Sequence, residues 1–145
     1  MRILLTIVHH WNPQGGGRHA SLRPDPKPRL HGLQDQLLAL ARLGTGQGAL
    51  NIGEMRVDNA NHALRHQFTI RIVTDGTHHL VDQLEEPYRP LVEHVPTSPP
   101  TPKHLGFEAQ RVLAEGLSEG YDLYGYLEDD LLIHDPLFFH KIFWF

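Results

Sequence analysis

The sequence contains no cysteine, and this absence limits the chemistry that the chain can carry out. Disulfides and thiolate metal sites are excluded, while the redox state of the surroundings stays undetermined. A long apolar stretch is also absent. The run from Ile3 to Val8 is too short for the core of a signal peptide, and nothing approaches the length of a membrane span. We therefore expect a cytoplasmic protein without a membrane span.

Excess positive charge is absent as well. The formal net charge is −4, with 21% charged and 40% hydrophobic residues, a balance that is ordinary for a globular protein. Nucleic acid is not expected as a partner, because binding to it depends largely on clustered lysine and arginine. The length of 145 residues indicates one domain over residues 1–145, large enough to bury a core but small for an enzyme with two substrate sites.

The apolar patterns predict an α/β order of elements. Continuous runs rich in β-branched residues are typical of buried parallel strands, and apolar residues at three- and four-residue spacing are typical of helices. The predicted fold class is α/β, with a mostly parallel sheet flanked by helices in a Rossmann-like arrangement. Gly44–His66 is expected to be a long loop with a short element around Ala49–Val57. We expect strands at Ile3–Val8, Phe68–Asp75, Leu91–Val95 and Tyr121–Leu127, helices at Arg29–Leu43 and Leu105–Glu119, and a last helix opened by Asp135 and Pro136.

Three adjacent carboxylates, Glu128, Asp129 and Asp130, directly follow the last predicted strand. In open parallel sheets, ligands bind beyond the carboxyl ends of the strands. In an extended chain Glu128 and Asp130 share one side, about 7 Å apart by Cα, while Asp129 faces the other way. Two such carboxylates repel each other by roughly a few kcal/mol, and a divalent cation between them turns this repulsion into attraction.

Oxygen ligands of this kind favour Mg²⁺ or Mn²⁺, which usually keep coordination positions for water and substrate phosphates. The pattern therefore predicts a metal-assisted site for a phosphate-bearing ligand. A solvated turn is the commoner role for a lone acidic triplet. It is disfavoured here because the triplet ends an apolar strand and is followed by LLIHDP rather than by a loose polar loop. His134 is a further candidate ligand, and equally a capping or surface histidine.

The segment YGYLEDDLLIHDP, within Tyr121–Pro136, resembles the acidic DxD region of GT-A glycosyltransferases, and the order of elements before it is similar to the nucleotide-binding half of that fold. The resemblance implies transfer of a sugar from a nucleotide-diphosphate donor to an acceptor, with Mn²⁺ or Mg²⁺ as cofactor. It implies metal binding by Asp130 and Glu128, and donor binding by Glu128 and Asp129. Glu128 stands where many members have aspartate. The match is close only in this segment, and Gly44–His66 has no counterpart.

Two further donor contacts are implied by the same resemblance. Asp75, after the second predicted strand, matches the position from which such folds commonly bind the base. Arg111, in GFEAQR, resembles the arginine of a Gly-x-x-x-Ala-Arg segment that approaches the nucleotide, although Gln110 replaces the alanine. The structural alternatives are a turn for Asp75 and a solvated helix position for Arg111.

The segment HHWNPQGGGRHA offers different signals after the first strand. His9, His10 and His19 lack the spacing of an HExxH motif, so metal binding by them is disfavoured. Gly15–Gly17 lets backbone N–H groups approach a phosphate, and a glycine run here resembles GT-B transferases, which bind the donor without a metal motif. A GT-B-like lobe is thus the second enzyme hypothesis. The third hypothesis is a non-catalytic nucleotide-binding, metal-binding or interaction module.

The final stretch, PLFFHKIFWF, is rich in aromatic side chains that need burial. We expect either a truncated chain or a homodimer that covers this surface. In GT-A enzymes the acceptor site and, in inverting members, the general base follow the acidic motif, so catalytic residues are expected beyond Phe145. The chain alone is expected to transfer little or no sugar.

Overall fold

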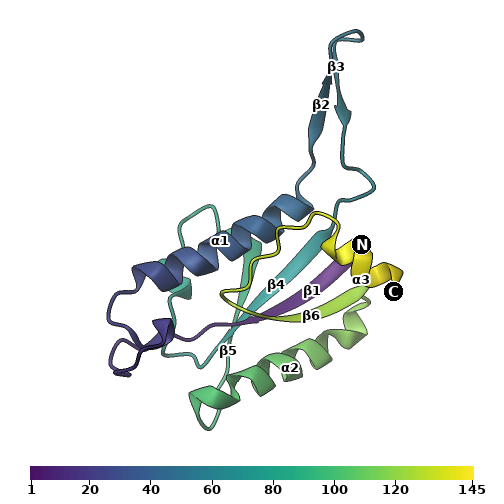
Figure 1. Ribbon diagram of the computed structural model, residues 1–145. Helices are drawn as coiled ribbons and strands as arrows, with labels where there is room; N and C mark the ends of the chain where they lie inside the picture. Colours follow the sequence, from purple (N-terminus) through teal and green to yellow (C-terminus); the bar gives the residue numbers. More distant parts are fainter.

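In the computed structural model of the protein, which describes residues 1–145, the chain folds around a four-stranded parallel sheet with strand order β5-β4-β1-β6 (Figure 1). The strands are β1 (Arg2–Val8), β4 (Gln67–Thr74), β5 (Val92–Pro96) and β6 (Leu123–Glu128). They form where the β-branched and apolar runs predicted them, because such side chains pack well on a pleated sheet. The predicted α/β class with a parallel sheet is confirmed.

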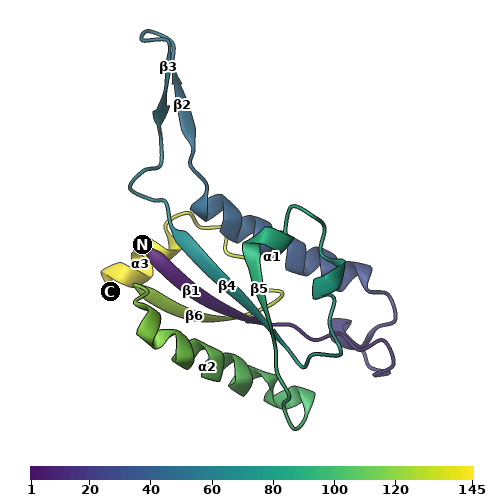
Figure 2. The same cartoon turned by 180° about the vertical axis from the view of Figure 1, so that it is seen from behind.

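Helices cover both faces of this sheet. Helix α1 (Lys27–Gly44) lies over one face and α2 (Leu105–Glu115) over the other, as the two opposite views show (Figures 1 and 2). Helix α3 (Phe138–Trp144) ends the chain. None of the helices combines the length and the apolar character needed to cross a membrane. Short 3₁₀ turns lie at Ala20–Leu22, Val81–Gln83, Arg89–Leu91, Pro102–His104 and Gly116–Glu119.

The direction of the strand order reverses beside β1. From β1 the chain passes through α1 to β4 and then to β5 on one side, and it returns through α2 to β6 on the other side of β1. The connection after β1 enters α1, and the turn after β6 is hydrogen-bonded to α1 through Gln36. In open α/β sheets this reversal is where ligands bind. The topology is therefore compatible with a Rossmann-like fold.

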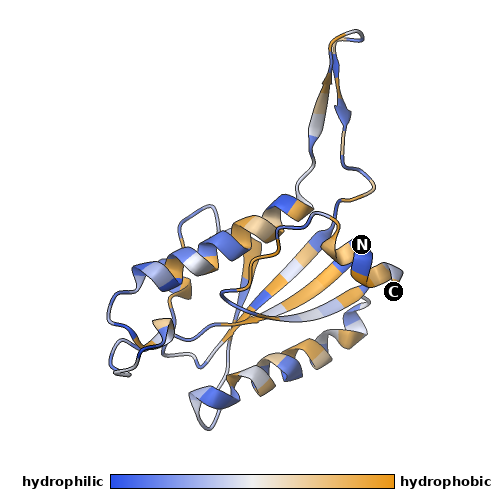
Figure 3. Cartoon of the chain, viewed as in Figure 1, coloured by the Kyte–Doolittle hydropathy of each residue, from blue (hydrophilic) through white to orange (hydrophobic).

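The core consists of two apolar layers separated by the sheet. On the α1 side, alternate residues of β1 (Ile3, Leu5, Ile7) pack against the inner face of α1, including the fully buried Leu37. On the α2 side, Val73 packs against Leu105, Ala109 and Val112. Full burial of each such aliphatic side chain contributes about 1.5–3 kcal/mol. Strand β1 accordingly appears almost continuously hydrophobic in Figure 3, whereas hydrophilic and hydrophobic residues alternate along α1.

An antiparallel hairpin made of β2 (Gly48–Asn51) and β3 (Arg56–Asn59) projects from the body of the protein (Figure 1). It lies in the region expected to be a long loop with one short element. The long connection was therefore predicted, but the hairpin was missed. Asn61 closes its base, since the side chain accepts from Gln47 N and donates to Thr45 O, both at 2.8 Å. Most hairpin residues are exposed, so the local turn and ladder bonds hold its shape.

Several boundaries differ from the expected ones. Helix α2 is followed by a 3₁₀ turn over Gly116–Glu119, and Gly120 ends it with a φ of 70°, as expected for a glycine stop. The last helix begins at Phe138 and not at Pro136, because Asp135 Oδ1 accepts a hydrogen bond from Leu137 N at 2.9 Å and holds a turn ahead of the helix.

Candidate functional site

The acidic segment forms a tight turn directly after β6. Leu131 N donates to Glu128 O at 3.2 Å, which closes the turn. The side chain of Gln36, fully buried on α1, donates its Nε2–H groups to Glu128 O at 2.7 Å and to Leu131 O at 2.9 Å. Because a buried carbonyl needs a hydrogen-bond donor, Gln36 fastens both ends of the turn to α1. The segment is thus a fixed part of the fold.

Asp129, at the centre of this turn, is 2% exposed and carries a charge into the interior. Its Oδ2 lies 2.5 Å from His9 Nδ1, and its Oδ1 forms an ion pair with Arg29 Nη2. His9 Nε2 accepts from Leu80 N at 3.1 Å, so the His9 proton is assigned to Nδ1, which donates to Asp129. Both oxygens of Asp129 are therefore engaged within the protein, and its role in donor binding stays a prediction.

Glu128 and Asp130 flank this buried carboxylate and face solvent. Asp130 is 63% exposed, and its nearest cationic partner is Arg29 Nη1 at 3.9 Å. Glu128 is exposed and lies near Tyr126, where burial together with the charges of Glu128 and Asp129 raises the pKa of the phenol. The three carboxylates do not converge into a three-ligand metal cluster. One or two free carboxylates nevertheless match the way Mg²⁺ and Mn²⁺ are usually held.

A cleft of about 670 Å³ opens at the carboxyl ends of β1 and β6, where the strand order reverses. Arg29 and Lys103 bring positive charge to it, and the Nε–H of Arg29 is buried without a hydrogen-bond partner. Arg29 also touches the acidic turn, so the turn and the cleft adjoin. The cleft is lined by Val8, His10, Asn12, Ser21, Leu22, Arg29, Thr101, Pro102, Lys103, Leu105, Gly106 and Tyr126.

The two weaker site predictions have different outcomes. Asp75 follows β4, and its Oδ1 accepts from Thr77 N at 2.9 Å and His78 N at 2.7 Å. Burial alone would raise the pKa of Asp75, but hydrogen bonds from the backbone and ring of His78 and from Thr77 N lower it to about 2. Arg111 lies on the solvent side of α2, paired with Glu108 and Glu115. The structure does not bring Arg111 to the cleft, and nucleotide contacts by both residues stay predictions.

The glycine run proposed for phosphate binding does not line the cleft. Gly15 and Gly17 face the Leu22 side chain, so closely that a Cβ at either position would meet it at 2.4 and 2.6 Å. Gly16 has a φ of 64°, the left-handed conformation that glycine allows. These glycines are explained by the packing of their own loop.

Sequence reasoning missed the importance of two adjacent histidines, His9 and His10. They follow β1 and point to opposite faces, His9 to Asp129 and His10 toward Asp75, 3.4 Å away. Burial lowers the pKa of His10, an effect that the Asp75 charge partly offsets. The available signal was their place just beyond the end of a strand, since this is where parallel sheets collect functional side chains. Gln36 was missed because a glutamine on a helix is usually exposed.

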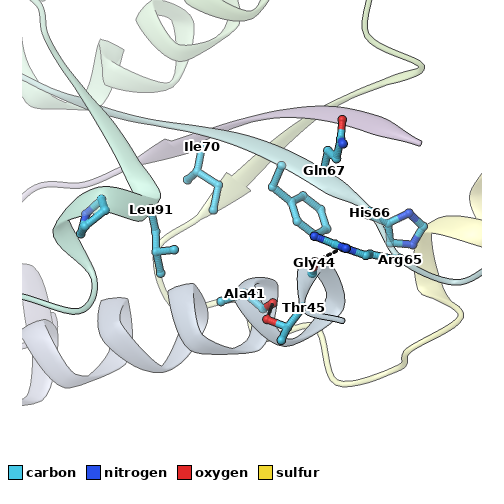
Figure 4. A pocket seen from close by; sticks show the side chains of 10 residues that line it. Ala41, Gly44, Thr45, Arg65, His66, Gln67, Ile70 and Leu91 are labelled. Carbon is cyan, nitrogen blue, oxygen red and sulfur yellow. Dashed lines mark hydrogen bonds between the residues drawn. The ribbon is translucent and has the colours of Figure 1, made fainter. Parts of the chain in front are cut away.

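A second cavity, of about 370 Å³, lies at the opposite end of the sheet, beside the first residues of β4 and the last turn of α1 (Figure 4). Two of its lining residues are joined by a hydrogen bond, which Arg65 Nε donates to Gly44 O at 2.9 Å. The cavity lies at the amino end of the strands, away from the acidic turn. It is therefore the weaker candidate for a metal or nucleotide site.

Comparisons with protein-family models, with curated proteins and with solved structures found no match. The cleft and the acidic turn beside it form the candidate site of this chain.

Proposed function

We propose that this chain is the donor-binding half of a glycosyltransferase with a GT-A-like arrangement, which binds a nucleotide-diphosphate sugar with the help of Mn²⁺ or Mg²⁺. The observation that carries this proposal is the fixed acidic turn beside a cationic cleft at the reversal of the strand order. A solvated surface turn would not need hydrogen bonds and ion pairs from Gln36 and Arg29 of helix α1 to fix its position. The resemblance of YGYLEDDLLIHDP to the DxD region supports the same function.

Arg29 and Lys103 supply the anion-binding side of the proposed site. Both line the cleft, and the guanidinium of Arg29, whose side chain is 17% exposed, is the group that donates to a phosphate oxygen. Asp129 anchors Arg29 from behind and thereby fixes the direction of the guanidinium. A planar, fixed guanidinium binds phosphate oxygens better than a mobile one, because less side-chain entropy is lost.

Glu128 and Asp130 supply the cation-binding side. Both carboxylates are exposed, Asp130 has only Arg29 at 3.9 Å as an ionic neighbour, and oxygen ligands suit Mn²⁺ or Mg²⁺. When bound, such an ion neutralises charge that develops on the leaving nucleoside diphosphate. The chain's own contribution is to hold these carboxylates and the Arg29 guanidinium in a fixed arrangement at the edge of the cleft.

Calorimetric titration with Mn²⁺ and with the uridine, guanosine, cytidine and adenosine diphosphates tests this function. We expect one diphosphate to bind only when Mn²⁺ is present, and Asp130→Asn to weaken this binding by at least tenfold. Asp35→Asn is the matched control, because Asp35 is exposed on α1 and makes the same change of charge away from the cleft. Nucleotide binding that is independent of metal would support the GT-B-like hypothesis instead. Absence of nucleotide binding would contradict both and leave an interaction module.

A further inference from the structure

Two histidines and one aspartate converge where β1 and β4 end, on the side of β1 away from the acidic turn. The parallel register pairs Val8 with Val73, so His10 and Asp75 each lie two residues beyond a paired position. Backbone bonds continue past the strands, from His9 N to Val73 O at 3.0 Å and from Trp11 N to His78 O at 2.9 Å. These bonds hold both loops in place, so the three side chains meet on a rigid support.

The Asp75 carboxylate is oriented by its own loop. Its Oδ1 is occupied by the backbone N–H groups of Thr77 and His78, which leaves Oδ2 turned toward the two imidazoles. Oδ2 lies 2.9 Å from His78 Nδ1 and 3.4 Å from His10 Nδ1. One ligand atom from each of the three residues lies within 4.8 Å of the other two.

His10 Nδ1 is the least satisfied atom of this group, since it is buried and has no hydrogen-bond partner. Zinc bonds of about 2.0–2.1 Å in a tetrahedral site separate neighbouring ligand atoms by roughly 3.3 Å. The 3.4 Å between His10 Nδ1 and Asp75 Oδ2 already matches this spacing. The His78 ring would have to move, because its Nδ1 lies 2.9 Å from Asp75 Oδ2, and its 41% exposure allows this.

We propose that His10, Asp75 and His78 form a binding site for a zinc-class divalent transition-metal ion, separate from the acidic turn. Two imidazole nitrogens and one carboxylate favour Zn²⁺ over Mg²⁺, which prefers oxygen ligands. Three protein ligands leave one position of a tetrahedral ion open, as in catalytic zinc sites. Side-chain exposures of 16% for His10, 11% for Asp75 and 41% for His78 allow an ion to enter. His10 also lines the cleft, which brings the open position within reach of a bound ligand.

This site gives Asp75 a different role from the base contact implied by sequence resemblance. It also requires no carboxylate of the acidic turn, because its residues come from the loops after β1 and β4. Zinc binding here and manganese-dependent nucleotide binding at the acidic turn can therefore succeed or fail independently.

Titration of the chelator-treated protein with Zn²⁺, followed by calorimetry, tests the site, and Co²⁺ absorption in the visible range reports its geometry. We expect one Zn²⁺ per chain, with His10→Gln and His78→Gln each weakening affinity by at least the 10–100-fold that loss of an outer-shell partner costs. His62→Gln, which removes an exposed histidine after the hairpin, is the matched control and should bind as the unaltered chain does. Asp130→Asn should also retain zinc binding.

Circular dichroism before each titration shows whether the variants are folded. If His10→Gln does not fold, the more exposed His78→Gln decides the matter. Zinc affinity that is unchanged in the folded His78 variant, or that falls equally in the His62 control, would overturn the proposal, as would the absence of stoichiometric binding.

Discussion

At the scale of single residues, the buried ion pair between Arg29 and Asp129 links the fold to the candidate site. Asp129 and His9 lie 120 residues apart in the chain and are joined by one hydrogen bond. A carboxylate buried to this degree is tolerated because a cation and a second donor compensate for the loss of water. Removal of the Asp129 charge leaves the largely buried Arg29 guanidinium with only the exposed Asp130, 3.9 Å away, as an acidic neighbour.

Replacement of Asp129 by asparagine is therefore expected to lower the free energy of unfolding by about 3–5 kcal/mol, since breaking a buried pair leaves an uncompensated charge. Chemical denaturation at neutral pH measures this loss. The exposed Asp35→Asn variant should change stability by no more than about 0.5 kcal/mol. A loss as small as the control's would show that the Arg29–Asp129 pair is not buried in solution.

His66 provides a second residue-scale prediction, concerning pH. Its ring is buried among Phe68, Phe139 and His140, with neither nitrogen hydrogen-bonded. Burial and then the His140 charge lower the pKa of His66 from 6.5 to about 4. At a pH between these two pKa values, His66 is protonated in the unfolded chain and neutral in the folded chain. Stability that is fully present above pH 6.5 should thus fall as the pH drops toward 4, by up to about 3 kcal/mol.

Denaturation curves recorded from pH 7 to pH 4.5 check this effect. His66→Phe should flatten the pH dependence, because phenylalanine fills the aromatic site without a titrating group. His62→Phe, at an exposed position, should leave the slope unchanged. Equal slopes for the His66 variant and the unaltered chain would exclude His66 as the source.

At the scale of elements, the β2–β3 hairpin is separable from the rest of the fold. Its base is closed by Asn61 and by a hydrogen bond from Ala60 N to Gln47 O at 2.8 Å, while its strands are largely exposed. The sheet and both covering helices bury their apolar residues without it. The hairpin therefore contributes little to the core.

Deletion of residues 49–58, which joins Gly48 to Asn59, should leave the melting temperature within a few degrees of that of the full chain. The shortened connection retains the bond between Gln47 and Ala60 around a Gly-Asn pair, a sequence favoured in two-residue hairpin turns. Differential scanning calorimetry measures the outcome, and the zinc and nucleotide titrations should be unaffected. Loss of cooperative unfolding would mean that the hairpin is required for the fold.

At the scale of the whole molecule, apolar side chains remain exposed on α3. Ile142, Phe143, Trp144 and Phe145 all face solvent, and Figure 1 shows α3 near the edge of the sheet. Phe139 alone is buried, packed into the core on the α1 side of the sheet. Exposed aromatic clusters of this kind favour association. The homodimer expected from the sequence is therefore still a prediction.

Sedimentation velocity over a range of protein concentrations is expected to show self-association that the double variant Phe143→Ser, Trp144→Ser reduces. Phe107→Ser is the control, since Phe107 is an exposed aromatic residue of α2 away from this surface. A chain that stays monomeric at every concentration, or a control that reduces association equally, would contradict this use of the surface.

Local patterns in the sequence were sufficient for the strands, the two main helices and the position of the acidic turn. Apolar periodicity reports which face of an element is buried, and this property belongs to the element alone. Gly120 marked the end of its helix because its preference is also local, whereas Asp135 makes a turn ahead of α3 and not the helix cap that was expected. The hairpin was not predicted because its alternating pattern is short and its strands bury few apolar side chains.

The sequence by itself determined the α/β class and the place of Glu128, Asp129 and Asp130 at the carboxyl end of the last strand. Only the tertiary structure decided that Asp129 is buried while Asp130 is exposed, and that His10 meets Asp75 across two strands. The physical reason is that periodicity specifies a buried face but not the partner that covers it. Ion pairs and ligand clusters depend on strand order and register, which arise from contacts between residues far apart in the chain.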